Sequence, residues 1–144
     1  MLRVSSALHD IGKIGIPDSV LLKPVNLDPD EWVVIKTHSA RGQRIVKAIV
    51  LPDAEEIGLV IRHHHEHFNG AGYPDGLTGD AIPILSRILS IADSYDAMGT
   101  PRVYHRARTH EEIMQVLSLE QGIKSDPYVF RKFCQIIETS ALRV

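Results

Sequence analysis

Residues 62–76 read RHHHEHFNGAGYPDG. Four of the five positions from 63 to 67 are histidine, and glycines follow at positions 70, 72 and 76. A helix over residues 53–68 would carry an apolar stripe whose centre falls almost on His64, with His65 at its edge. A buried imidazole needs a partner for each ring nitrogen. The stretch therefore predicts either a metal site or a hydrogen-bonded histidine cluster.

Other segments also direct histidine or aspartate toward the interior. His9 and Asp10 follow a short apolar stretch, and His38 lies on the inner side of its predicted helix. Asp93 stands on the apolar stripe of the next strongly amphipathic helix. Facing helices of a bundle assemble sites from such side chains. Mixed imidazole and carboxylate donors favour iron, manganese or zinc, and six donors favour two metal ions, the usual clamp for attack on a phosphodiester.

A plain structural role is the alternative for each of these residues taken singly. A lone inward histidine is more often a hydrogen-bonded core residue than a ligand. Asp93 has Arg87 and Arg102 as candidate ion-pair partners. His63 would point into solvent from the predicted helix, and His67 is a weak additional ligand candidate.

Composition describes an ordinary globular chain. Its 144 residues suit one domain, and 44% hydrophobic with 24% charged residues is far from a disordered composition. A formal charge of -2 provides no basic surface for nucleic acid. Cys134 is the single cysteine, which fits a reducing compartment, and no apolar run is long enough to span a membrane. We therefore expect a cytoplasmic protein that binds neither nucleic acid polymers nor a membrane.

The pattern of helix starts predicts an all-α fold, a single helical bundle. Asp28 and Thr109 are each followed three residues later by glutamate, which is the capping-box signature, and Asp126 precedes a proline. The expected helices run from Asp28 toward His38, over 53–68, over 84–98, over 109–120 and from Asp126 onward, with loops at 14–27, 69–83 and 99–108.

Four motifs together resemble the HD-GYP family, a branch of the HD phosphohydrolase superfamily in bacteria. They are HDIGKIGIPD at 9–18, HHE at 64–66, GYP at 72–74 and IAD at 91–93, and the resemblance extends from about residue 7 to residue 130. It implies a helical bundle with two or three divalent metal ions, iron or manganese. It also implies hydrolysis of the bacterial second messenger cyclic di-GMP to pGpG or GMP.

The resemblance implies a role for individual residues. The family's metal ligands fall on His9, Asp10, His38, His64, His65 and Asp93, the same residues that helical geometry directs inward. Asp10 would bridge two metals, which activate a hydroxide for attack on phosphorus. Lys13 and Arg102 would contact phosphate, with Lys13 stabilising the developing charge, and Tyr73 would line the guanine side of the pocket.

The chain also departs from the family pattern. Asn69 replaces the usual aspartate, Val103 the usual proline, and His105 a basic residue that contacts phosphate. Only eight residues precede His9, whereas family members have upstream helices that supply a further glutamate and histidine ligand. We therefore expect residues 1–144 to form a single HD-GYP domain that is incomplete at its N-terminus.

The expected partners follow from the same resemblance. Cyclic di-GMP would be the substrate, and the loop at 69–76 would dock diguanylate cyclase domains. Apolar faces left uncovered would be buried by homodimerisation or by a partner domain. Two other functions are alternatives: a non-catalytic binding module of this family, and an HD-type hydrolase of another nucleotide.

Overall fold

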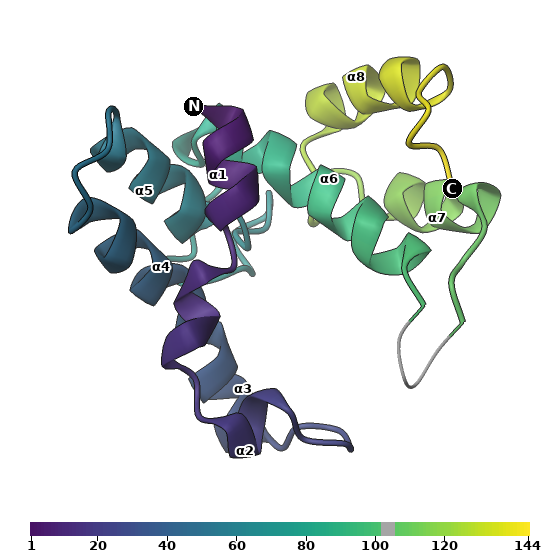
Figure 1. Cartoon of the computed structure of the whole chain (residues 1–144). Coiled ribbons are helices and arrows are strands. Elements are labelled where there is room, and N and C mark those ends of the chain that lie inside the picture. Colours follow the sequence, from purple (N-terminus) through teal and green to yellow (C-terminus); the bar gives the residue numbers. More distant parts are fainter. Residues whose placement is uncertain (102–105) are drawn as a thin grey trace.

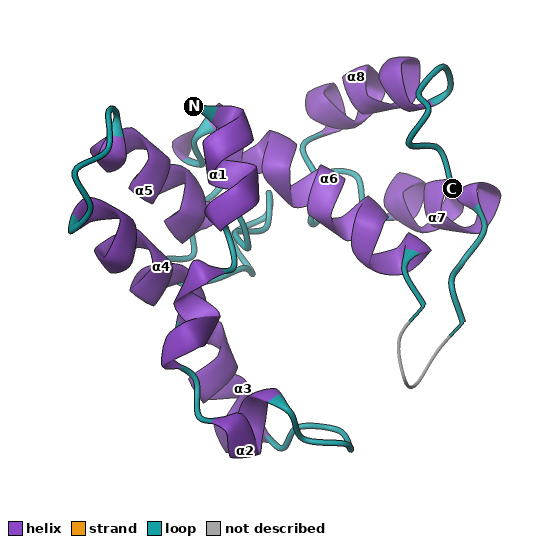
Figure 2. Ribbon diagram, in the orientation of Figure 1, coloured by secondary structure: helices purple, strands orange, loops and turns teal. Residues whose placement is uncertain are grey.

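The computed structural model describes residues 1–101 and 106–144. Within these residues the chain is helical and contains no strand, only two isolated β-bridges (Figure 2). The predicted all-α class is therefore confirmed. The elements in chain order are α1 (Leu2–Leu8), the 3-10 turn η1 (Ile11–Gly15), α2 (Asp18–Leu21), α3 (Pro29–Lys36), α4 (His38–Lys47), α5 (Ala54–His63), the 3-10 turn η2 (Gly79–Ala81), α6 (Ile84–Gly99), α7 (His110–Leu119) and α8 (Pro127–Ile137).

Three of the predicted helix starts are confirmed by their hydrogen bonds. Asp28 and Thr109 each form a complete capping box, at the starts of α3 and α7. The Asp126 carboxylate accepts from two backbone N–H groups in the first turn of α8. Asp53 precedes α5 as expected, but its backbone is left-handed, with φ of 59°, and its side chain makes no cap hydrogen bond.

Two helices end earlier than predicted. The helix that begins at Asp28 stops at Lys36, and a separate helix, α4, starts at His38. The helix predicted over 53–68 stops at His63. Beyond this point the backbone N–H groups of Phe68 and Asn69 donate to carbonyls of the distant segment 123–124, so contacts across the fold replace the next helical turns.

The core divides into two clusters, which α6 joins (Figure 1). The first lies between α4 and α5, centred on Val46, Ile57 and Ile61, and α1 packs against it. The second fills the space between α6, α7 and α8, with Ile113 and Leu117 fully buried. The second cluster consists of Ile91, Tyr95, Ile113, Leu117, Val129, Phe130 and Ile137.

The buried side of α6 is not a single stripe. Leu89, Ile91 and Tyr95 are buried, whereas Ile84 and Ala92 are exposed. The helix changes neighbours along its length, from α5 at its start to α7 and α8 further on, so no single stripe describes its buried side.

A backbone contact at Gly12 joins η1 to α4. A Cβ atom on Gly12 would lie 1.8 Å from the His38 carbonyl oxygen and 2.5 Å from the Gly42 nitrogen. Only glycine permits this approach. The contact brings His9 and Asp10, which directly precede η1, next to His38 at the start of α4.

We expect Gly12→Ala to lower the free energy of unfolding by at least about 2 kcal/mol, because the added methyl group meets backbone that cannot rotate away. Urea denaturation followed by circular dichroism measures the change. Gly58→Ala is the matched control, since its Cβ would meet flexible side-chain carbons of Gln43 and Lys47, at 3.2 and 3.3 Å. Equal losses of stability in the two variants would contradict the role of the Gly12 contact.

Candidate metal centre

The six residues predicted as metal ligands lie together where α1, α4, α5 and α6 meet. Ring nitrogens of His38, His64 and His65 all lie within 4.8 Å of one another. The carboxylate of Asp10 extends this group, with Oδ1 3.5 Å from Nε2 of His38.

His9 links the second carboxylate to the cluster. Its Nε2 is 3.6 Å from Oδ2 of Asp10 and 3.4 Å from Oδ1 of Asp93. The fold thus gathers side chains that are up to 84 positions apart in sequence (93 minus 9). Their role as metal ligands stays a prediction, which this arrangement supports.

Three of the histidines are oriented by the same hydrogen bond. Nδ1 of His9, His38 and His64 lies 2.7, 2.8 and 2.6 Å from the backbone carbonyl oxygen three residues earlier in the chain. A carbonyl oxygen only accepts, so Nδ1 carries the proton. In a neutral ring Nε2 then has a free lone pair, which is the form in which histidine binds metals.

The Nε2 atoms of two of these histidines form no hydrogen bond with the described residues. Among the described residues, Nε2 of His38 and of His64 is buried without a hydrogen-bond partner. Unsatisfied buried polar atoms are rare in folded proteins and call for an explanation such as an ion. With Asp10 and Asp93 beside them, the donor set is the mixed imidazole and carboxylate set that suits iron, manganese or zinc.

Burial keeps the innermost rings neutral. It lowers the pKa of His64 to about 4 and, as the largest cause, the pKa of His65 to about 2. Burial also lowers the pKa of His38. His9 differs, because its hydrogen bond to Asp93 raises its pKa.

The two carboxylates stay ionised at neutral pH. Burial is the largest single influence on Asp10 and opposes its ionisation, but the hydrogen bond and charge of Lys13, together with the charges of His9 and His38, outweigh it and lower the pKa. Asp93 shows the same balance: burial opposes its ionisation most strongly, but the His9 hydrogen bond and the charges of the neighbouring histidines together lower the pKa. Neutral rings and charged carboxylates are the protonation states required of metal ligands.

Two residues predicted to contact substrate border the cluster. Lys13 lies beside it, with Nζ 2.6 Å from Oδ2 of Asp10. The Tyr73 ring stacks on His65 with centroids 4.9 Å apart, and burial raises the pKa of its hydroxyl. Arg102, predicted to contact phosphate, lies outside the described residues, as do Val103 and His105.

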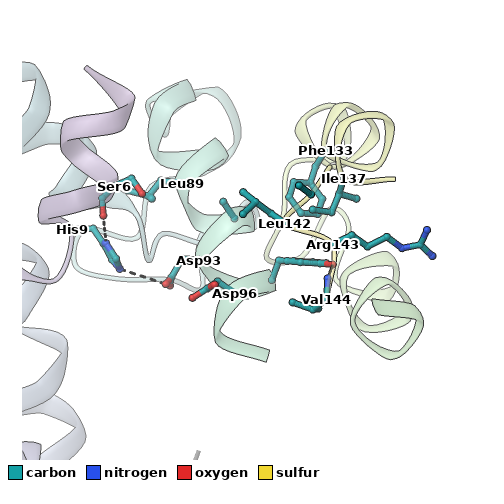
Figure 3. A pocket seen from close by; sticks show the side chains of 13 residues that line it. Ser6, His9, Leu89, Asp93, Asp96, Phe133, Ile137, Leu142, Arg143 and Val144 are labelled. Atoms are coloured by element: carbon teal, nitrogen blue, oxygen red, sulfur yellow. Dashed lines mark hydrogen bonds and ion pairs between the residues drawn. The ribbon is translucent and has the colours of Figure 1, made fainter. Parts of the chain in front are cut away.

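The alternative partner for Asp93 is partly excluded. Arg87 pairs with Asp80 and with buried Asp126, at 2.8 and 2.7 Å, rather than with Asp93. Asp93 instead contacts His9, and the two residues together line one side of a cavity of about 570 Å³ (Figure 3). The opposite wall of this cavity comes from α8 and the C-terminal segment. The candidate centre is thus open to this cavity on the side of His9 and Asp93.

The prediction for His63 was wrong. It was expected in solvent, but it is 7% exposed, and its Nε2 lies 2.9 Å from Oδ2 of Asp75. The reason is the early end of α5, after which the loop at 69–76 folds back over the last helical turn. Sequence analysis also missed Glu66, which is 2% exposed. His67 is half-buried and is not part of the histidine cluster.

The pKa of His64 predicts how stability depends on pH in the presence of a chelator. Above pH 6.5 neither the folded nor the unfolded chain binds this proton. As the pH falls from 6.5 toward 4, the unfolded chain takes up a proton that folded His64 refuses, so the free energy of unfolding falls. The raised pKa of His9 acts with the opposite sign, at and above pH 6.5.

Urea denaturation at a series of pH values measures this dependence. His64→Leu should give a shallower slope between pH 6.5 and 4 than the unchanged chain, because one linked proton is removed. Slopes that coincide in the two proteins would show that His64 has the same pKa in the folded and unfolded chain, which contradicts the lowered pKa.

Comparison with known proteins assigns the chain to a family. The HD domain family model matches residues 1–129. The chain is 38% identical to a probable cyclic di-GMP phosphodiesterase of Vibrio cholerae, covering 90% of the chain and 31% of the relative. It is 40% identical to a cyclic di-GMP phosphodiesterase response regulator of Xanthomonas campestris, covering 88% of the chain and 34% of the relative.

Other relatives carry a different substrate in their names. A 3'3'-cGAMP-specific phosphodiesterase of Vibrio cholerae is 42% identical over 88% of the chain and 24% of its own length. The crystal structure of a cyclic GMP-AMP specific phosphodiesterase from the same organism superposes with a TM-score of 0.70. It shares 22% identity, over 96% of this chain and 38% of that chain. The chain spans about a third of the length of the first two curated relatives.

The HD and GYP motifs both lie within the matched residues, and the helical fold agrees with that of the solved relative. The chain therefore belongs to the HD domain family, in its HD-GYP branch.

Proposed function

We propose that this chain is a metal-dependent phosphodiesterase domain that hydrolyses cyclic di-GMP to pGpG or GMP. The observation that carries the proposal is the pair of buried Nε2 atoms, on His38 and His64, that have no hydrogen-bond partner among the described residues. Their rings lie in one cluster with His65, and Nε2 of His38 is 3.5 Å from Oδ1 of the ionised Asp10. Residues 1–144 would form one such domain. Relatives named as cyclic di-GMP phosphodiesterases support the choice of substrate.

The cofactor would be two or three divalent ions, iron or manganese. His9, Asp10, His38, His64, His65 and Asp93 would hold them. When bound, such ions activate water and polarise phosphoryl oxygens. HD phosphohydrolases depend on metal, but the donor types alone do not separate iron from manganese or zinc.

The histidines, Lys13 and Tyr73 would each have a separate role in the reaction. The Nδ1 hydrogen bonds hold three histidines in one tautomer and one direction before any ion binds. Lys13 places an ammonium group next to Asp10, where it would stabilise negative charge that develops on the phosphoryl oxygens. Tyr73 covers His65 and would form a wall against the guanine base.

A second cyclic dinucleotide, 3'3'-cGAMP, is also a candidate substrate. Relatives named as 3'3'-cGAMP-specific reach 42% identity, so the chain resembles enzymes of both specificities. Hydrolysis of 3'3'-cGAMP is therefore the second candidate function. The same donor cluster would serve both reactions, since the two substrates share their phosphodiester linkages.

Two partner predictions remain proposals. The loop at 69–76 would dock diguanylate cyclase domains, and a homodimer would cover exposed apolar side chains. Leu22, Val25 and Val33, on and around α2 and α3, are between 59% and 70% exposed. No helix in the described part of the chain combines the length and apolar composition that a membrane span requires.

The central test is turnover of cyclic di-GMP and 3'3'-cGAMP by the chain loaded anaerobically with iron(II) or manganese(II). We expect Asp10→Asn and His64→Ala to lose both metal and product, because each removes a donor from the cluster. Asp30→Asn, an exposed aspartate on α3, is the matched control. A folded chain that holds less than one ion would instead be a binding module, and a loaded chain inactive on both nucleotides would contradict the proposed reaction.

Lys13→Gln should lower kcat by roughly 100-fold with a smaller effect on KM, because its charge would act on the transition state. Steady-state kinetics of the metal-loaded chain measure both constants. Lys132→Gln, in which a lysine of α8 is replaced, provides the control for loss of one positive charge. A change in KM alone would show that Lys13 only binds substrate.

A further inference from the structure

His65 is held differently from the other histidines of the candidate centre. His9, His38 and His64 each donate from Nδ1 to a backbone carbonyl, but no hydrogen bond from the described residues fixes the His65 ring. Its neighbours are three rings: His64, Tyr73 and His38, with centroids 3.9, 4.9 and 5.0 Å away, and the Tyr73 ring is the one that stacks on it, inclined by 29°. His38 and His64 are themselves fixed by their Nδ1 hydrogen bonds, so the direction of the His65 ring depends on where the loop places Tyr73.

Tyr73 belongs to a loop that packs backbone against backbone on residues 65–67. Its N–H donates to the His65 carbonyl, at 3.1 Å. A Cβ atom on Gly72 would lie 2.1 Å from the His67 nitrogen and 2.6 Å from the Glu66 Cα, so only glycine allows this approach. The loop needs further contacts to keep this position, because glycine leaves its backbone free to adopt other conformations.

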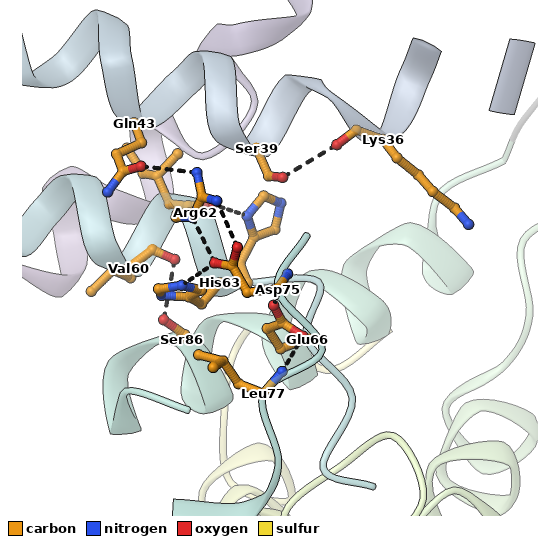
Figure 4. Close-up of polar contacts among 12 residues, drawn as sticks. Lys36, Ser39, Gln43, Val60, Arg62, His63, Glu66, Asp75, Leu77 and Ser86 are labelled. Atoms are coloured by element: carbon orange, nitrogen blue, oxygen red, sulfur yellow. Dashed lines mark hydrogen bonds and ion pairs between the residues drawn. The ribbon is translucent and has the colours of Figure 1, made fainter. Parts of the chain in front are cut away.

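Glu66 supplies contacts from beneath the loop. Its carboxylate is buried, and each oxygen accepts one backbone N–H: Oε1 from Asp75 at 2.7 Å and Oε2 from Leu77 at 3.0 Å (Figure 4). Hydrogen bonds to a carboxylate are among the stronger ones in proteins. The chain that directly follows Tyr73 and Pro74 is thus tied to the residue that directly follows His65.

Asp75 ties the same segment to the last turn of α5. Its carboxylate receives two hydrogen bonds from the Arg62 guanidinium, both 2.6 Å, and a third contact from Nε2 of His63, at 2.9 Å (Figure 4). Arg62 continues the network to Gln43 on α4, at 3.2 Å. Both ends of the short segment after Tyr73 are therefore held by ionised groups on or next to α5.

This second cluster is not itself suited to an ion. His63, Glu66 and Asp75 lie close enough together to suggest ligation. However, both Glu66 oxygens already accept backbone N–H groups, and the Arg62 guanidinium occupies the carboxylate of Asp75. The hydrogen bonds of these side chains instead hold the loop after Tyr73 in place.

We propose that Glu66 and Asp75 are positioning residues, which hold Tyr73 against His65 and thereby set the direction of the His65 ring in the candidate metal centre. The proposal rests on the proposed function, because it assigns His65 to a metal. Neither side chain contacts a ring of the ligand cluster, because Glu66 bonds backbone N–H groups of the loop and Asp75 bonds Arg62 and His63; both side chains would act through Tyr73.

The experiment that tests the proposal uses the whole chain, in chelator at a pH where the histidines are neutral. Stacking on Tyr73 places the His65 ring protons in the shielding region of the tyrosine ring, which shifts their NMR signals. Tyr73→Leu gives the reference signal for an unstacked His65. We expect Glu66→Gln and Asp75→Asn to move the His65 signal toward that reference, while the signal of His9, whose ring contacts neither Tyr73 nor His65, stays in place.

Controls separate positioning from a general loss of structure. Glu56→Gln changes the same charge at an exposed position of α5 and should leave the His65 signal unchanged. Asp75→Asn keeps both Glu66 acceptor bonds, so it provides the test if Glu66→Gln disturbs the fold more widely. A His65 signal that stays at its original position in a folded Asp75→Asn or Glu66→Gln chain would overturn the proposal.

Manganese(II) affinity, measured by calorimetry, provides a second readout. Residues that orient a ligand from outside the coordination shell change metal affinity by roughly 10- to 100-fold when replaced. We expect a loss in that range for Glu66→Gln and none for Glu56→Gln. The NMR result does not depend on turnover, so an inactive chain with a shifted His65 signal would contradict the proposed reaction and still support the positioning role.

Discussion

The candidate centre depends on hydrogen bonds from imidazole rings to carbonyl oxygens at the ends of helices. The last carbonyls of a helix have no partner within it and must find one elsewhere. His9 and His64 stand directly after α1 and α5, and their Nδ1 atoms bond the carbonyls of Ser6 and Ile61 in the last helical turns. One interaction thus completes a helix end and points an Nε2 atom at the neighbouring ligands. The centre therefore requires that α1 and α5 both end next to it.

The division of the core into two clusters explains why α6 carries a ligand. Asp93 lies on α6 between Ile91 and Tyr95, which belong to the cluster with α7 and α8, and its carboxylate faces His9 at the end of α1. The seam between the clusters is also where the cavity opens beside His9. A ligand at this point of α6 therefore connects the two halves of the fold, and the Gly12 contact holds the first half close enough to meet it.

Local chemistry made the helix starts predictable, whereas the helix ends depended on tertiary contacts. The capping box at Asp28 involves residues that are adjacent in sequence, and it is present as expected. The end of α5 at His63 depends on a loop that returns to cover it and on backbone bonds to residues 123–124, neither of which a periodic pattern reveals. The inward position of His64 was predicted correctly although the helix ends one residue before it, because the side chain is fully buried in either case. His63 was misplaced because its direction depends on that helix end.

Two clusters of histidine and carboxylate lie side by side in this fold, and charge balance separates their roles. At Asp75 the Arg62 guanidinium already supplies the cation, in a bidentate ion pair. In the candidate centre Lys13 reaches Asp10, whereas Asp93 contacts only His9 among the described residues. Burial keeps the other rings neutral, so two carboxylates share one ammonium group and one imidazole whose proton a metal would displace. A cluster with more negative than fixed positive charge, and with lone pairs directed inward, favours a divalent cation over further hydrogen bonds.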